Sequence, residues 1–172
     1  QAGMPLVAIW EIDQQRAFQE HSLGGQRQLG ASDAQAAKTA LAQAGGAGHA
    51  IYFTVDFDIT PKVWNTTLKD SKTGKQIQIG DLVSAYFQGI DSVIGSARAG
   101  VYGTYTVVHE LFDQGLVHYG WQQTFGNHKS DPHDPRAQLR QYDIYPDQTG
   151  WGVSGAGALD LDRAVHPKFG QW

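Results

Sequence analysis

The sequence predicts an α/β fold in which parallel strands alternate with covering helices. Short apolar runs that suit buried strands alternate with stretches whose apolar residues recur at helical spacing. Several strand candidates are apolar on both faces, which is typical of parallel strands covered by helices. The 172 residues, 41% hydrophobic and 17% charged, suit one folded soluble domain with a substantial core. We therefore expect a single domain over residues 1–172 with right-handed crossovers.

Three helices are expected from periodicity and end signals. The first follows a capping-box pattern that runs from Ser32 to Gln35, and Gly45-Gly46 stops its alanine-rich stretch. The second runs from about Asp81 to Ile94, just before Gly95. The third starts near Thr104 and ends before Gly115.

Six strands are expected around these helices, the last two on weaker signals: Pro5–Trp10, Ala50–Val55, Ala99–Tyr102, Val117–Trp121, Gln138–Tyr142 and Gly157–Leu159. Two insertions interrupt the alternation of strand and helix. Thr60–Gln78 is rich in Lys and Thr, and Gly126–Arg136 is rich in His, Asp and Pro. Both compositions predict surface loops.

Polar or aromatic residues stand where most strand candidates end. In chain order they are Glu11, Asp56 and Asp58, Tyr102, Gln122, Gln141 and Tyr142, and Asp160 and Asp162. The carboxyl ends of the strands in a barrel share one open face, so these side chains are expected to converge there. Buried unpaired carboxylates are costly, so a converging set should perform chemistry, bind a ligand or form ion pairs.

Asp56 and Asp58 form the most informative pair. Two residues apart on an extended chain, they emerge on the same face with Cα atoms roughly 6–7 Å apart. Two carboxyls at this separation suit glycosidic bond cleavage, in which one is the general acid and the other stabilises positive charge or activates a nucleophile. The alternative is a structural role, with both carboxylates bonded to loop amides at the end of a strand.

Composition excludes several other functions. The net charge of −4 argues against a nucleic-acid or anionic-membrane partner. The chain has no cysteine, which rules out thiol catalysis, disulfides and cysteine-ligated zinc. No apolar run approaches the ~20 residues of a spanning helix, so membrane insertion is not expected. The first residues carry neither the basic segment nor the apolar core of a signal peptide.

A metal-dependent deacetylase is a further alternative for Asp56 and Asp58. That chemistry normally adds two histidines four residues apart on a helix, and no two of the seven histidines have this spacing. The segment His128–Asp134 could coordinate a divalent cation through mixed nitrogen and oxygen ligands. A solvated turn set by its prolines explains the same segment, and we expect neither a metal nor a cofactor.

Five motifs in fixed order carry a family resemblance: Ile51–Asp58, Ala99–Gly103, Trp121–Gln123, Gln141-Tyr142 and Ala158–Asp162. Together they resemble the exported bacterial glycoside-hydrolase-like domain typified by a twin-arginine-secreted mycobacterial envelope protein. More distantly, the chain is similar to the family 25 glycoside hydrolases, the N-acetylmuramidase lysozymes. The resemblance covers about Gly3 to Val165. It implies a (β/α) TIM-barrel-like fold, a secreted or cell-envelope location, and a glycan such as peptidoglycan as substrate.

The sequence also differs from the muramidase pattern in two respects. The fourth strand of the muramidases ends in Asp-x-Glu, and its Glu, the general acid, corresponds here to Asp58, which is one methylene shorter. A misplacement of ~1 Å can cost ~100-fold in rate. The first strand here ends at Glu11 and matches the third strand of the family, so the first two strand–helix units have no counterpart. Six strands cannot close an eight-stranded barrel, which predicts a truncated or processed barrel, with other domains of a longer polypeptide as candidate partners.

Two functional hypotheses follow. In the first, the protein hydrolyses an amino-sugar glycan, with Asp58 as the acid, Asp56 stabilising the transition state, and Glu11 or Asp160 in support. The residues expected to line the sugar subsite are Tyr102, Trp121, Gln122, Gln141, Tyr142 and Asp162. In the second, the same scaffold is a non-catalytic carbohydrate- or envelope-binding module that lost its acid through the change from Glu to Asp.

Overall fold

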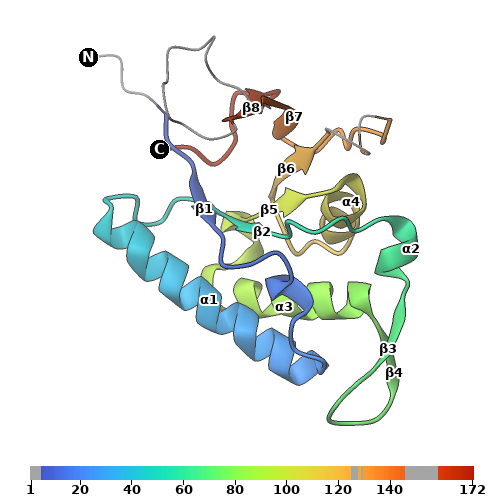
Figure 1. The fold of residues 1–172 in the computed structure, drawn as a ribbon. Helices are drawn as coiled ribbons and strands as arrows, with labels where there is room; N and C mark the ends of the chain where they lie inside the picture. The colour runs from blue at the N-terminus through green and yellow to red at the C-terminus, as the bar shows by residue number, and fades with distance from the viewer. Residues whose placement is uncertain (1–4, 125–127, 129, 146–158) are drawn as a thin grey trace.

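A curled six-stranded sheet forms the centre of the molecule (Figure 1). The computed structural model describes residues 5–124, 128, 130–145 and 159–172, and of residues 142–145 and 159–161 the backbone alone. The strands follow the spatial order β1-β2-β5-β6-β7-β8. Their bounds are β1 Ala8–Trp10, β2 Ile51–Thr54, β5 Ala99–Gly103, β6 Tyr119–Gln123, β7 Leu139–Tyr145 and β8 Leu159–Ala164. Strand–helix alternation and the mixed α/β class are thereby confirmed.

The sheet is parallel from β1 to β7, but its last pair is antiparallel. Leu139 pairs with Ala164 and Tyr145 with Leu159, and the register shifts between Gln141 and Asp143. The uniformly parallel sheet expected of a TIM barrel therefore does not extend to β8. An antiparallel neighbour needs no crossover helix. The connecting sequence, residues 146–158, is rich in glycine and shows no helical spacing.

The helices pack against one face of the sheet, and the core lies between them. They are α1 Leu23–Gln43, α3 Ile79–Ile94 and α4 Tyr105–Asp113, with short 3-10 turns at Arg16–Phe18 and Ser96–Arg98. Ile51, Phe53 and Val55 alternate toward the helices and are fully or almost fully buried. The intervening residues Tyr52 and Thr54 face the opposite side of the sheet. The sheet thus has one apolar face covered by helices and a second face that carries aromatic and polar side chains such as Tyr52 and Thr54.

The first helix starts ten residues earlier than the Ser32 capping box predicts, so that prediction is wrong. The cap of α1 is Ser22, whose hydroxyl accepts a hydrogen bond from Gly25 N at 3.2 Å. Gly30, within α1, has a packing role. A Cβ at Gly30 would lie 2.0 Å from the carbonyl oxygen of Tyr86 on α3. Figure 1 shows α1 and α3 side by side beneath the sheet.

Asp33 lies inside α1, where it joins three segments. Arg16 donates to both of its carboxylate oxygens at 2.8 Å, and the Tyr86 hydroxyl donates to Oδ2 at 2.9 Å. Asp33 and Tyr86 are almost completely buried. Burial and the neighbouring Asp33 carboxylate both raise the pKa of Tyr86. This network fastens the segment after β1 to the helix layer.

The Thr60–Gln78 insertion forms a small subdomain, whereas the sequence predicted a surface loop. It contains α2 Pro61–Trp64 and the antiparallel hairpin of β3 Thr67–Lys69 with β4 Gln76–Gln78. Asp70, buried in the hairpin loop, accepts backbone hydrogen bonds from Thr73 at 2.7 Å and from Leu23 at 3.2 Å. Hydrogen bonding from the Thr73 backbone is the main cause that lowers the pKa of Asp70. The hairpin is thus docked at the start of α1.

The C-terminal segment returns to the beginning of the sheet. Leu6 and Trp172 exchange two backbone hydrogen bonds, at 3.1 and 3.2 Å. The Tyr52 hydroxyl donates to the carbonyl oxygen of Phe169 at 2.8 Å. None of the helices in the described part of the chain is long and apolar enough to cross a membrane.

Candidate active site

The two carboxylates singled out in the sequence follow directly after β2. Val55 N donates to the carbonyl oxygen of Tyr102 at 2.8 Å, which extends the β2–β5 pairing to the residue before Asp56. Asp56 is half-buried, and the Asp58 side chain is 56% exposed. Both therefore stand at the carboxyl edge of the parallel sheet, where the loops after successive strands meet.

Asp58 has a histidine partner that the sequence reasoning did not assign. His128 Nε2 lies 3.0 Å from Asp58 Oδ1, and His128 Nδ1 lies 2.8 Å from Asp131 Oδ2. The His128 side chain is only 8% exposed. The contact joins positions 70 residues apart, so only the acid- and histidine-rich composition of the segment after β6 signalled it. Among the described residues, no group of three or more His, Asp and Glu side chains is arranged to hold a metal ion.

An aromatic cluster occupies the sheet face opposite the helices. Tyr102 and Trp121 are neighbours on β5 and β6, and their rings meet edge to face at 5.5 Å. Tyr102 OH donates to Gln141 Oε1, and Trp121 Nε1 donates to Asp162 Oδ1 at 2.7 Å. Four of the six residues expected to bind sugar thus come together on one face, which carries both ring surface and polar groups.

Tyr52 supports this cluster from β2, and the sequence analysis had not singled it out. Its ring lies 5.9 Å from that of Trp121 in an edge-to-face arrangement. The side chain is fully buried, and burial, with a smaller contribution from Tyr119, raises its pKa. The alternation Tyr52–Thr54 places it on the face of Tyr102, a signal that was available in the sequence.

Gln122 lies on the helix-covered face, away from the aromatic cluster. It pairs in register with Gly103 and Arg140, and its side chain is fully buried. Its Nε2 donates to the carbonyl oxygen of Pro132 at 2.8 Å, and its Oε1 accepts from Asp134 N at 2.9 Å. Both ends of the amide are thus bonded to the loop before β7, and Gln122 positions that loop and does not lie on the face of the aromatic cluster.

The remaining predicted residues are scattered along the same sheet. Glu11 follows β1 and is exposed. Asp160 pairs in register with Ile144, so the antiparallel β8 brings it to the carboxyl end of β7. Tyr142 stands at the register shift of β7. For Asp160 and Tyr142, the structure describes the backbone alone, so their predicted roles stay predictions.

Asp134 fastens the loop between β6 and β7 to α4. It is fully buried and receives two hydrogen bonds from the Arg136 guanidinium, at 2.9 and 2.7 Å, with His109 Nδ1 at 2.8 Å. Burial, the largest single influence, raises the pKa of Asp134. The bonds from Arg136 and His109 together outweigh it and lower the pKa to about 2.

Asp134→Asn is expected to lower the free energy of unfolding by about 2 kcal/mol near neutral pH, after allowance for screening at the partly exposed Arg136. The folded pKa is depressed, so the carboxylate stabilises the protein above the unfolded value of ~3.9. That stabilisation is lost as pH falls from about 4 toward about 2. Urea unfolding at several pH values measures it, with Asp91→Asn, an exposed aspartate outside this network, as control. A difference that did not change over that interval would contradict the assignment.

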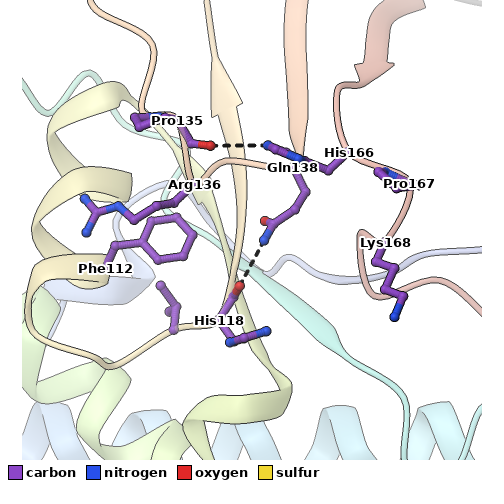
Figure 2. Close-up of a pocket in the computed structure, with 9 residues that line it drawn as sticks. Phe112, His118, Pro135, Arg136, Gln138, His166, Pro167 and Lys168 are labelled. Atoms are coloured by element: carbon purple, nitrogen blue, oxygen red, sulfur yellow. Dashed lines mark hydrogen bonds between the residues drawn. The ribbon is translucent and has the colours of Figure 1, made fainter.

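A separate hollow lies at the amino ends of β6 and β7 (Figure 2). Its volume is about 510 Å³, and its lining includes Phe112, His118, Arg136, His166 and Lys168. None of the predicted site residues lines it. Two polar groups at its wall already have partners: Gln138 Nε2 donates to the carbonyl oxygen of His118 at 3.1 Å, and His166 Nε2 lies 3.2 Å from the carbonyl oxygen of Pro135. The hollow is therefore at the opposite end of the strands from Asp58.

Comparison with known proteins identifies a family and a mycobacterial relative. The family model described as "Rv2525c-like, glycoside hydrolase-like domain" matches residues 1–164. A Mycobacterium tuberculosis (strain ATCC 25618 / H37Rv) protein named "Putative peptidoglycan hydrolase Rv2525c" is 34% identical over 95 residues. The match spans 55% of this chain and 37% of that protein.

Crystal structures of the same mycobacterial protein, described as Tat-secreted, are similar in fold. The complex with L-tartrate superposes with a TM-score of 0.69 at 26% identity, over 98% of this chain and 72% of that one. The complex with HEPES gives a TM-score of 0.70 at 25% identity, over 99% and 72%.

Proposed function

Because the chain belongs to the Rv2525c-like glycoside hydrolase-like domain family, we propose that it hydrolyses glycosidic bonds in a bacterial cell-wall or related amino-sugar glycan. The observation that carries the proposal is the position of Asp56 and Asp58. They follow β2 at the carboxyl edge of the sheet, and the aromatic cluster lies on the face next to them. The name of the mycobacterial relative supports peptidoglycan as the substrate.

Asp58 is the general acid in this proposal, and Asp56 stabilises the positive charge that develops on the sugar. Asp58 is well exposed, as a group that must reach a glycosidic oxygen has to be. Asp56 is half-buried, where a carboxylate interacts more strongly with a nearby cation than it would in bulk water. Glu11 and Asp160 are supporting carboxylates of the same edge.

The sugar-binding subsite consists of Tyr102, Trp121, Gln141 and Asp162, with Tyr142 beside Gln141 in the sequence. Aromatic rings pack on the apolar faces of pyranose rings, and amide and carboxylate groups accept bonds from sugar hydroxyls. The hydrogen bonds between Tyr102 and Gln141 and between Trp121 and Asp162 preorganise these side chains. Gln122 contributes indirectly, through the loop that carries His128 and Asp131.

Further parts of the proposal concern the whole protein. The helix-covered outer face and the aromatic inner face of β1–β7 suit part of a (β/α) TIM barrel whose first two units are missing from this chain. We treat residues 1–172 as one domain, with other domains of a longer polypeptide as candidate partners. The location is secreted or in the cell envelope, which the Tat-secreted relative supports.

The direct test is incubation with purified peptidoglycan, followed by mass spectrometry of the released fragments and an assay of new reducing ends. New reducing ends with intact amino sugars are expected. Release of fragments through peptide-bond cleavage, or no release at any enzyme concentration, would contradict the proposal.

A non-catalytic glycan-binding module is the second candidate, and one contact favours it. His128 holds the carboxylate that would have to be the acid, and this carboxylate belongs to an Asp where the muramidases have Glu. Binding of intact glycan without new reducing ends would favour this candidate.

Trp121→Ala is expected to weaken binding of a chitin oligosaccharide by about tenfold, because it removes the ring and the N–H bonded to Asp162. Trp121→Phe keeps a ring and should lose less. Isothermal titration calorimetry measures both, with Tyr105→Ala on α4 as a control on the helix-covered side. Equal affinities for Trp121→Ala and the parent would remove Trp121 from the subsite.

A further inference from the structure

Asp58, His128 and Asp131 form a chain of carboxylate, imidazole and carboxylate. The segment after β2 supplies Asp58, and the segment after β6 supplies the other two residues. The two contacts measure 3.0 Å at Nε2 and 2.8 Å at Nδ1. Exposure decreases from Asp58 (56%) and Asp131 (33%) to His128 (8%). The ring is therefore enclosed, while Asp58 still reaches solvent.

Both ring nitrogens of His128 face an acceptor, which restricts the form of the ring. A neutral imidazole carries one N–H and can donate to one carboxylate, whereas an imidazolium donates to both. A charge in an enclosed place needs compensation, and Asp131 provides it. Asp58 therefore accepts a hydrogen bond from an imidazolium whose positive charge is compensated by the Asp131 carboxylate on the other side of the ring.

We propose that His128 is the positioning residue of Asp58 and that Asp131 fixes the His128 ring. This inference rests on the proposed hydrolase function. His128 Nε2–H binds Asp58 Oδ1, so Oδ2 is the oxygen that faces the substrate. Holding the acid in one orientation compensates for the methylene that Asp58 lacks relative to the Glu of the muramidases.

His128 also stabilises the Asp58 carboxylate that forms when the proton is transferred to the substrate. The O–H bond of Asp58 breaks as its proton passes to the glycosidic oxygen, and the leaving sugar departs with a new hydroxyl. Asp58 is then a carboxylate, and the Nε2–H of His128 stabilises it by a charge-assisted hydrogen bond. The water that adds its oxygen to the anomeric carbon returns a proton to Asp58. His128 keeps both of its protons throughout.

The state of the ring is tested first without any activity measurement. NMR spectra of protein labelled with ¹⁵N at histidine, recorded at about pH 5, are expected to show two slowly exchanging N–H protons for His128. Asp131→Asn should abolish or shift the Nδ1–H signal, and Asp58→Asn the Nε2–H signal. Rapid exchange at both nitrogens in the parent would overturn the proposed chain.

Hydrolysis of peptidoglycan is tested next with His128→Gln and Asp131→Asn. Gln can still donate a hydrogen bond but carries no charge, so kcat should fall about 100-fold with KM within about twofold. Asp131→Asn should lower kcat about tenfold and move the alkaline limb of the pH profile, which reports loss of the proton from Asp58. His118→Gln, an exposed histidine at the other end of β6, is the control and should match the parent.

The two possible failures can be told apart. If the parent hydrolyses glycan and His128→Gln keeps the parent's kcat and pH profile, this inference is wrong and the proposed function stands. If the parent shows no turnover, the proposed function is wrong, and so is the role of His128 in it. The NMR spectra still show whether the hydrogen bonds from His128 to Asp58 and Asp131 exist. Circular dichroism shows whether His128→Gln is folded. If it is not, Asp131→Asn tests the positioning role instead, because the asparagine keeps a hydrogen-bond acceptor at the same place.

Discussion

Asp58→Asn is expected to lower kcat/KM for peptidoglycan by about 1000-fold, because the amide N–H is far too weak an acid to protonate a leaving sugar. The substitution nearly preserves the shape of the side chain, and the amide oxygen can still accept a hydrogen bond from His128. Affinity for an intact oligosaccharide should therefore stay within about threefold of the parent. Reducing-end release measures the first quantity, and calorimetry with a chitin oligosaccharide measures the second.

The matched control is Asp91→Asn, an exposed aspartate near the end of α3, on the amino side of the sheet. It should leave both quantities unchanged. Turnover by Asp58→Asn equal to that of the parent would remove Asp58 from the mechanism. Loss of oligosaccharide affinity together with turnover would instead assign Asp58 to substrate binding.

Gly30→Ala and Gly89→Ala are each expected to lower the free energy of unfolding by about 3 kcal/mol or more. A Cβ at Gly30 would lie 2.0 Å from the carbonyl oxygen of Tyr86, and one at Gly89 would lie 2.0 Å from the carbonyl oxygen of Arg27. Both obstacles are backbone atoms, so no side-chain rotation can relieve them. The helices α1 and α3 must separate, and the buried contacts around Asp33 weaken with them.

Gly24→Ala provides the matched control in the same helix. A Cβ at Gly24 would meet nothing within 4 Å, so the only change is the better helix propensity of alanine. Its free energy of unfolding should rise by about 0.5 kcal/mol. Urea denaturation of the three variants measures the contrast. Equal stabilities for Gly30→Ala and Gly24→Ala would show that the helices can move apart at little cost.

Local patterns in the sequence predict much of the fold, and α3 shows why. Its apolar residues recur at helical spacing, and Gly95 adopts a φ of 80° just after its end. The helix observed, Ile79–Ile94, begins two residues before the one predicted. The start of α1 could not be found in this way, because Gly30, which signals a break in isolation, is required by the packing of the distant helix α3 against α1.

In the candidate site, too, local patterns predict some features, whereas features that depend on long-range contacts could not be predicted. The motif ending in Asp56 and Asp58 predicts their place at a strand end because strand direction and alternation are local properties. The pairing of Asp58 with His128 depends on a loop that returns from β6, which no periodicity encodes. Gln122 was assigned to the sugar-binding face because it stands near a strand end. Alternation from Trp121, its neighbour, already places it on the opposite face.

The reciprocal bonds between Leu6 and Trp172 have a mechanical consequence. A stretching force applied to the two ends of the chain reaches this backbone pair before it loads any strand of the sheet. The two bonds oppose that force together with the packing of Trp172 against the core, and the pair should open before the sheet does. The extension gained would be short, and the main rupture, when the helices detach from the sheet, should follow as a distinct second event.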